Sequence, residues 1–549
     1  MNTQHISTSR RDFLKTSASM AGMFLLGFPA WGAQDYPRRT IHPYPNKLAW
    51  GDGTLRLSKR ATLALGRDCD VEMMKDLWQR FTFGAVKLDV TSDPSLKPVE
   101  FSLAGARPPQ REPNDTYALT VNASGIAASG VDAAAVRHAW FTMLQLLQPG
   151  DDSVAASLLA ARRTTSDSPP AASRLAATVA VSNHDLSFAV PHVEIHDWPV
   201  MKFRGLHLCI FRETPPHMIE RAIRLAAFFK FTHVVLEFWG MLKLEALKEL
   251  SWPEAWTKAE AGKLVRIARS MGLEVIPMFN SWGHATACRI AYGRHVVLDQ
   301  NPRLAPLFEP DGWTWCLTNP RTLDLLRRVH DELIEFAGPG QYFHIGCDEA
   351  YSHATCDRCR QTDRVQLFAD HINNLAAHLE KRGRRAMMWG DALLERAKWP
   401  SGFAANGSPA LPTHLALDRV SRKIIINDWH YDVKGEVPTL AHFRERGLET
   451  IACPWNSTAN IRALSKAAVA NKSDGLLMTT WHHLVQSIPA LHYTAACVWS
   501  KDQAALGLRQ AEGALPRAAT ASILRKLAPA DGKFDRAGWN TFELPSVID

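Results

Sequence analysis

Short apolar runs alternate with amphipathic stretches between about residue 200 and residue 500, which is the pattern of repeated strand–helix units. Eight of the runs have the length of buried strands: 203–210, 232–238, 273–279, 342–346, 385–389, 423–428, 449–454 and 475–480. Eight strands with helices between them over about 300 residues is the size of a closed parallel barrel. The pattern predicts an α/β fold over residues 200–500, a (β/α)8 TIM barrel.

The segment before the barrel has a different pattern. In residues 40–198, short apolar runs typical of strands alternate with polar turns. We expect a hairpin formed by residues 116–121 and 125–129. From Val131 to Leu147 the apolar residues fall at helical spacing, and Asp132 is placed to cap that helix. We therefore expect a small α+β domain over residues 40–198, with a surface loop from 150 to 173. Residues 501–549 are expected to form a C-terminal helix, from about Pro516 to Leu527, and a polar tail.

The first 33 residues have the features of a twin-arginine export signal. Arg10 and Arg11 precede an apolar stretch at 18–28, and the small residues Ala30 and Ala33 suit cleavage. That stretch is too short to span a bilayer, and no later segment reaches the roughly twenty apolar residues that spanning requires. We expect a signal peptide at 1–33 and a periplasmic or secreted protein with no integral membrane segment after its removal.

Composition and charge indicate a chain with two cores and no nucleic-acid-binding surface. With 46% hydrophobic residues, a chain of 549 residues has enough apolar material for two cores. The formal net charge is +8, and charges of both signs alternate except in a basic run at 381–385. We interpret this run as a solvated helix end before a strand, because nucleic-acid binding would need a broader basic stripe. We expect no nucleic-acid partner.

The nine cysteines are odd in number and scattered, which is not the spacing of a disulfide framework. Cys356 and Cys359 form one suggestive pair, with His353 nearby. A structural zinc ion needs four ligands, so this pair is compatible with a zinc site, a local disulfide or two free thiols. The sequence predicts no cofactor and no metal in the reaction.

Two adjacent carboxylates, Asp348 and Glu349, follow the fourth apolar run. Side chains alternate faces along a strand, so neighbours share one cavity only where the strand ends and the backbone turns, as in the loops of a barrel. The alternative is a solvated acidic turn, because charged residues are mostly exposed. In a cavity, burial beside an ionised neighbour keeps a carboxyl protonated near neutral pH. One acid can then donate a proton while its neighbour stabilises positive charge, and we assign Glu349 as the general acid.

Aromatic and polar residues follow almost every predicted strand, at the end where a parallel barrel carries its functional groups. An aromatic ring packs on the C–H face of a pyranose while carboxylates and amides bind the hydroxyls. Each tryptophan taken alone could equally belong to the core, but the set indicates a sugar pocket. Its expected members are Glu237, His284, Trp389, Asp391, Trp429, Tyr431, Trp455 and Trp481.

Several motifs resemble glycoside hydrolase family 20, the β-N-acetylhexosaminidases. The family signature His-x-Gly-x-Asp-Glu matches His344, Gly346, Asp348 and Glu349 at the end of the fourth strand. The family's entry into the barrel is similar to segments 194–199 and 203–206. The start of its small domain is similar to segments 41–45 and 50–53. Segment 315–320 resembles the segment that leads to the catalytic strand in the hexosaminidase D-like branch.

The resemblance implies an exo-acting, retaining enzyme that releases terminal GlcNAc or GalNAc from a carbohydrate substrate. The family is an exception to the two-carboxylate mechanism, because the 2-acetamido group of the substrate attacks and forms an oxazolinium ion. Asp348 would orient the acetamido nitrogen, and Tyr431 is the nearest candidate for its oxygen. Arg204 would bind ring hydroxyls through its guanidinium fork. The alternative for Arg204 is a structural ion pair beneath the barrel.

The chain departs from the family pattern at two places. Many relatives have an aspartate where this chain has Cys209, and an acidic residue after the last strand where it has His482 and His483. These positions bear on gluco or galacto preference rather than on the reaction. Alternatives are a modified-sugar or disaccharide-releasing hexosaminidase, a non-catalytic amino-sugar binding protein, and a metal-dependent deacetylase. The deacetylase is disfavoured because the histidines lack ligand spacing on one element.

Overall fold

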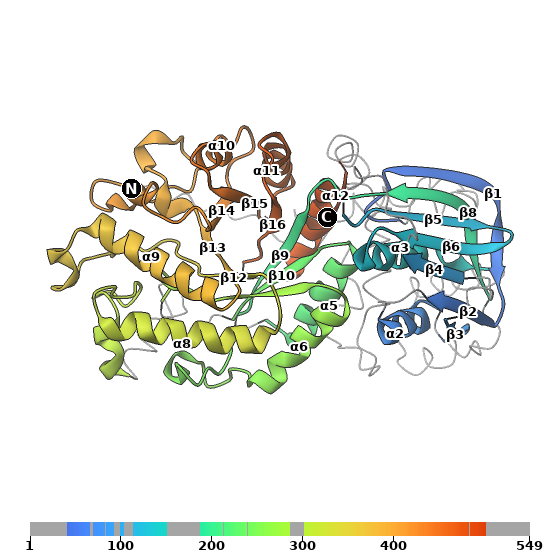
Figure 1. Cartoon of the computed structure of the whole chain (residues 1–549), viewed down its shortest axis with the longest axis horizontal. Coiled ribbons are helices and arrows are strands. Elements are labelled where there is room, and N and C mark those ends of the chain that lie inside the picture. Colours follow the sequence, from blue (N-terminus) through green and yellow to red (C-terminus); the bar gives the residue numbers. More distant parts are fainter. Residues whose placement is uncertain are drawn as a thin grey trace, which may run out of the picture.

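A computed structural model describes residues 41–65, 70–82, 84–92, 99–103, 114–150, 187–211, 214–238, 240–285, 301–481 and 484–500. Five predicted features lie outside these residues: the signal peptide, positions 151–173 of the surface loop, His482, His483 and the helix from Pro516 to Leu527. The described chain forms a mixed sheet with two helices, followed by a closed barrel (Figure 1). Within the described residues, no helix combines the length and hydrophobicity needed to cross a bilayer.

The N-terminal sheet has the strand order β1-β8-β5-β6-β4-β2-β3, with β7 paired to β8. The predicted hairpin is confirmed, because β5 and β6 pair antiparallel around Asn122 and Gly125. The predicted helix is confirmed as α3, and the side chain of Asp132 accepts a hydrogen bond from the amide of Ala135. The elements are β1 (Lys47–Leu57), β2 (Arg60–Leu65), α2 (Val71–Phe81), β3 (Lys87–Thr91), β4 (Val99–Leu103), β5 (Tyr117–Asn122), β6 (Gly125–Gly130), α3 (Ala133–Leu146), β7 (Gln148–Pro149) and β8 (Phe188–Asp197).

The predicted (β/α)8 barrel is confirmed: eight parallel strands close in the order β10-β11-β12-β13-β14-β15-β16-β9. Each of the eight predicted apolar runs overlaps one of these strands, and seven of the runs contain the whole strand; β14 extends one residue beyond its run, to Trp429. A helix follows each strand except β13, which is followed by short 3-10 turns. The elements are β9 (Phe203–Cys209), α5 (Pro216–Phe228), β10 (His233–Glu237), α6 (Lys258–Ser270), β11 (Glu274–Met278), α8 (Pro320–Ala337), β12 (Tyr342–His344), α9 (Arg364–Lys381), β13 (Arg385–Trp389), β14 (Ile425–Trp429), α10 (Thr439–Arg444), β15 (Glu449–Cys453), α11 (Thr458–Ala470), β16 (Gly475–Met478) and α12 (Ile488–Trp499).

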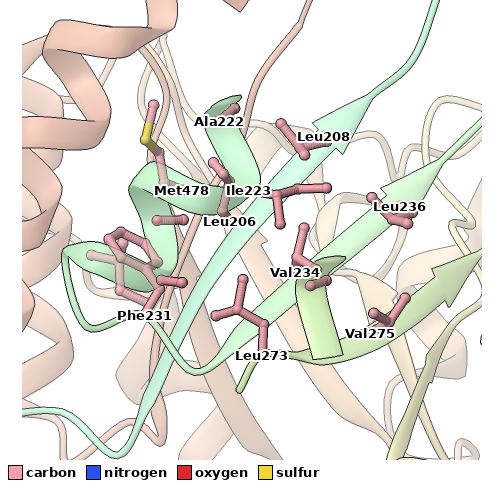
Figure 2. Packing of buried hydrophobic residues seen from close by; sticks show 14 of the residues in the cluster. Leu206, Leu208, Ala222, Ile223, Phe231, Val234, Leu236, Leu273, Val275 and Met478 are labelled. Carbon is pink, nitrogen blue, oxygen red and sulfur yellow. The ribbon is translucent and has the colours of Figure 1, made fainter. Parts of the chain in front are cut away.

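Both faces of the barrel strands are buried, as expected of a parallel sheet covered by helices. Leu206 and Leu208 of β9 pack outward with Val234 of β10 and Ile223 of α5 (Figure 2). The inward side chains form a separate cluster inside the barrel. It consists of Phe203, Val235, Ile276, Met278, Met387, Trp389, Ile425, Ile451, Cys453 and Leu477.

A buried ionic cluster joins the barrel to the N-terminal sheet. Arg204 is fully buried; its Nη2 donates to Asp115 Oδ2 at 2.5 Å and its Nε donates to the carbonyl of Lys230 at 2.7 Å. Lys230 in turn lies 3.1 Å from Asp197, the last residue of β8. The carboxylate of Asp197 also accepts hydrogen bonds from Tyr117 and Trp499. These contacts satisfy each charge, as burial of an ion requires.

The predicted sugar-binding role of Arg204 is therefore wrong, and the alternative of a structural ion pair is the observed arrangement. Phe203 points into the barrel, so its neighbour Arg204 must point outward. Arg204 also lies at the start of β9, whereas the acid pair follows the end of β12.

Candidate active site

The loop after β12 turns so that two adjacent acids both approach the side chain of His284. Cys347 and Glu349 have left-handed backbone conformations, with φ of 75° and 50°. This conformation is uncommon for residues other than glycine and is typical of functional loops. Gly346 has φ 68°, and a Cβ there would collide with the side chain of Asn280. A Cβ at Gly283 would collide with the carbonyl oxygen of Asp348, so only glycine lets the β11 loop approach the acids.

His284 lies between the two acids. Its Nε2 is 3.2 Å from Asp348 Oδ2 and 3.3 Å from Glu349 Oε2. Burial opposes the charged imidazole, but the adjacent carboxylates raise the pKa of His284 to about 10. Burial raises the pKa of Asp348, and the cation of His284 counteracts part of that increase. The Glu349 side chain is 34% exposed and that of Asp348 10%, so Glu349 is the acid that an incoming ligand reaches more easily.

Asp391 supports the acid loop from the next strand. It is buried, and its carboxylate accepts hydrogen bonds from the amide of Glu349 at 3.2 Å and from Trp429 Nε1 at 3.1 Å. The side-chain amide of Asn406 donates to the same carboxylate. Burial and the charge of Asp348 raise the pKa of Asp391 to about 8, despite these donors. Asp391 thus holds both the acid loop and the side chain of Trp429 in place.

A continuous aromatic wall extends from β13 to β16. Trp429 and Trp455 flank Tyr431, with ring centroids 4.9 and 5.4 Å apart. Trp481 Nε1 donates to the Tyr431 hydroxyl at 2.9 Å, and the Trp481 ring lies 6.2 Å from that of Trp389. Trp389 is buried, whereas the other four are partly exposed. The fold therefore assembles five of the predicted pocket residues into one surface.

Glu237 lies in a polar layer at the barrel mouth rather than free in the cavity. One carboxylate oxygen is 2.9 Å from His207 Nε2, and the other accepts from Asn280 Nδ2 at 2.6 Å. Glu237, Asn280 and His284 line one side of a cavity whose remaining walls are mostly apolar. Its predicted role as a substrate-binding residue stays a prediction.

Two residues that support the acid loop were not predicted. Trp313 packs its ring 4.4 Å from that of His284 and donates from Nε1 to the carbonyl of Glu349 at 2.8 Å. Asn406 holds Asp391. Trp313 lies two residues before the 315–320 motif, and this motif could have indicated that Trp313 belongs to the site. Asn406 lies in a loop of small residues, and no motif near it in the sequence indicates a role in the site.

Two groups among the described residues are close enough to hold a metal ion. One is His284 with Asp348 and Glu349, where the histidine already serves as the counter-cation of the acids. The other consists of Glu309, Cys316, Cys356 and Cys359. His353 does not join it, because its Nδ1 accepts from Trp282 Nε1 and its Nε2 lies 3.1 Å from the carbonyl of Arg364.

Sequence comparison gives two matches that together cover most of the chain. The family model "Glycosyl hydrolase family 20, catalytic domain" matches residues 203–509. The model "Glycosyl hydrolase family 20, domain 2" matches residues 38–198. The first match alone covers more than half of the 549 residues.

Individual relatives are distant. The chain is 23% identical to a β-hexosaminidase of Porphyromonas gingivalis over 66% of its length and 46% of that protein. It is 27% identical to hexosaminidase D of Bos taurus over 29% of its length and 46% of that protein. The chain thus spans about half the length of these curated relatives. A variant Streptomyces plicatus β-hexosaminidase solved with the product GlcNAc has a TM-score of 0.61 and 17% identity, covering 91% of this chain and 97% of that one.

Proposed function

Because the chain belongs to glycosyl hydrolase family 20, we propose that it is an exo-acting, retaining β-N-acetylhexosaminidase that releases terminal GlcNAc or GalNAc. The observation that carries this proposal is the placement of Asp348 and Glu349 around His284 at the mouth of the barrel. The β-hexosaminidases named above, one of them solved with GlcNAc, support the same substrate class.

In this proposal Glu349 is the general acid. A glycosidic oxygen leaves poorly until it is protonated, and the more exposed of the two acids is the one positioned to meet it. As the bond to the leaving oxygen breaks, the carbonyl oxygen of the 2-acetamido group attacks the anomeric carbon. The proton of Glu349 passes to the leaving alcohol, and Glu349 becomes the base for the next step.

Asp348 stabilises the cyclic oxazolinium ion that results. Its carboxylate accepts the acetamido N–H and balances the positive charge, which is worth most in a buried site. Water, deprotonated by Glu349, then attacks the anomeric carbon and regenerates the acetamido group with overall retention. Asp348 and Glu349 are consecutive residues of one loop, so they do not straddle the scissile bond as an acid and a nucleophile would.

The remaining residues bind and orient the sugar. The wall of Trp389, Trp429, Trp455 and Trp481 offers apolar faces to the pyranose and the acetyl methyl group. The hydroxyl of Tyr431 accepts from Trp481, and as a donor it would bind the acetamido oxygen. A non-catalytic sugar-binding protein would use this wall but would have no need of a paired acid.

We also propose that the protein is exported by the twin-arginine route, from the Arg10-Arg11 motif and the short apolar segment that follows. The mature enzyme would then act on glycans in the periplasm or outside the cell.

The activity is tested by nitrophenol release from para-nitrophenyl N-acetyl-β-glucosaminide and N-acetyl-β-galactosaminide, with the β-glucoside as control. We expect hydrolysis of at least one N-acetyl substrate and little of the glucoside. A correctly folded protein that cleaves neither N-acetyl substrate contradicts the proposed activity.

A further inference from the structure

Three cysteines and one glutamate meet between two loops beside the active site. Cys316 precedes α8, and Cys356 and Cys359 lie in the long loop between β12 and α9. Cys316 Sγ is 3.7 Å from Cys356 Sγ and 3.6 Å from Cys359 Sγ. One ligand atom from each of these residues and from Glu309 lies within 4.8 Å of all the others. We call Glu309, Cys316, Cys356 and Cys359 the Cys3Glu cluster.

The spacing of the sulfurs fits tetrahedral coordination. Zinc binds thiolate sulfur at about 2.3 Å in tetrahedral sites, so two such sulfurs lie about 3.8 Å apart. The two sulfur–sulfur distances from Cys316, 3.6 and 3.7 Å, are close to that value. A disulfide would require about 2.05 Å. Three thiols and a carboxylate supply four protein ligands, which is the closed ligand set of a structural zinc site.

The donors around the cluster suit negatively charged ligands. The amide of Cys359 donates to Cys356 Sγ at 3.4 Å, and Arg358 Nη2 donates to Cys316 Sγ at 3.4 Å. Thr318 Oγ1 lies 3.1 Å from Cys359 Sγ. Such contacts to the ligands orient them and offset part of the charge of a thiolate-rich centre.

Glu309 gives an independent indication of a bound cation. It is only 1% exposed, and its Oε2 accepts from the amides of Thr355 and Cys356 at 3.0 and 2.6 Å. Its Oε1 is buried and has no N–H or O–H donor among the described residues, and the thiol of Cys359 is the group that faces this carboxylate. A thiol is a weak donor and compensates a buried carboxylate oxygen poorly, whereas a cation in the cluster would satisfy it. A disulfide between two of the cysteines would provide no cation for this oxygen and would leave the third thiol unused.

We propose that the Cys3Glu cluster binds one structural zinc ion. The sequence left zinc, a disulfide and free thiols open because only Cys356 and Cys359 are close in sequence. The fold supplies Cys316 and Glu309 from a loop about forty residues earlier. With four protein ligands and no open position, the ion takes no part in glycoside cleavage.

The bound ion would tie together the two loops that form the acid side of the active site. Cys316 lies three residues after Trp313, whose ring packs on His284. Cys356 and Cys359 lie in the same loop as Asp348 and Glu349. Trp313 already joins the loops by donating to the carbonyl of Glu349. The ion would add a second, stronger connection at the far end of both loops.

The test is metal and thiol analysis of the full chain, produced in zinc-supplemented medium and purified without chelators or metal-affinity resin. We expect one zinc ion per chain by elemental analysis, and a native mass higher than the denatured mass by one zinc. Cys316→Ser and Cys356→Ser should each lower zinc content at least tenfold. The matched control Cys497→Ser, a buried cysteine of α12, should leave zinc content unchanged.

The wild-type protein alone can overturn the proposal, so the test does not depend on the variants folding. Absence of zinc, together with a denatured mass lower by two hydrogens, would assign a disulfide. Absence of zinc with all three cysteines open to alkylation in the native state would assign free thiols. Either result refutes the zinc site, and neither depends on hydrolase activity.

Discussion

Replacing His284 with glutamine tests whether its imidazolium sets the charge of the acid pair. The proposed reaction needs Asp348 ionised when substrate binds, and the His284 cation lowers the pKa of Asp348 against the effect of burial. Glutamine keeps a hydrogen-bond donor near the carboxylates and removes the charge. Asp348 should then remain protonated to a higher pH, so the acidic limb of the pH profile of kcat/KM should move upward.

The distances give the size of the shift. Opposite charges at the 3.2 Å that separates His284 Nε2 from Asp348 Oδ2 attract by about 5 kcal/mol at an effective dielectric of about 20. At 1.36 kcal/mol per unit this is an upper limit of nearly 4 pKa units. The amide donor of glutamine, and water that enters the space left by the imidazole ring, offset part of the lost attraction for the Asp348 carboxylate. We therefore expect the acidic limb to rise by about 2 pH units.

The assay is kcat/KM for an N-acetyl-β-glucosaminide across the acidic and neutral range, with His371→Gln as the matched control. His371 is also buried, but its Nε2 hydrogen-bonds to the carbonyl of Ser281 at 2.8 Å rather than to an acid of the site, so His371→Gln should keep the acidic limb of the wild-type pH profile. A second readout is stability. The folded pKa of His284 is raised to about 10, so its stabilising contribution is complete below pH 6.5 and is lost as the pH rises toward 10. An acidic limb unchanged in His284→Gln would refute the electrostatic role.

Three further predictions address other parts of the molecule. Glu349→Gln should reduce turnover of alkyl glycosides by roughly 10²-fold to 10⁴-fold and affect nitrophenyl glycosides much less, because these need little protonation; equal losses would count against the general acid. Replacing Arg10-Arg11 with Lys-Lys should retain the protein in the cytoplasm, and unchanged export by cell fractionation would exclude the twin-arginine route. Asp197→Ala should lower the free energy of unfolding by about 3 to 5 kcal/mol in urea denaturation, since the charge of Lys230 would remain buried without a carboxylate to balance it. Asp324→Ala, which removes an exposed ion pair with Arg328, should change it by less than about 0.5 kcal/mol.

The sequence was most informative where local rules apply. Helix capping by Asp132, the β5–β6 hairpin and the eight apolar runs depend on neighbours in the chain, and the structure confirms them. The adjacent acids were also interpretable, because two neighbours can face one cavity only where a strand ends.

The sequence was misleading or silent where tertiary contacts decide. Both faces of a parallel strand are buried, so the pattern of β9 does not reveal that Phe203 points inward and Arg204 outward. The partner that holds Arg204, Asp115, belongs to the other domain. The approach of Cys316 and Glu309 to Cys356 and Cys359 likewise depends on how two loops meet after the barrel closes.

The central claim is that the substrate supplies its own nucleophile. The most direct measurement is kcat/KM for nitrophenyl glucosaminides whose acetyl group carries an increasing number of fluorine atoms. Fluorine withdraws electrons from the acetamido carbonyl with little change in size. If this oxygen attacks the anomeric carbon, kcat/KM should fall steeply, by orders of magnitude, from the acetyl to the trifluoroacetyl substrate. Rates that stay constant along the series, or a covalent sugar ester trapped on Asp348, would contradict the mechanism.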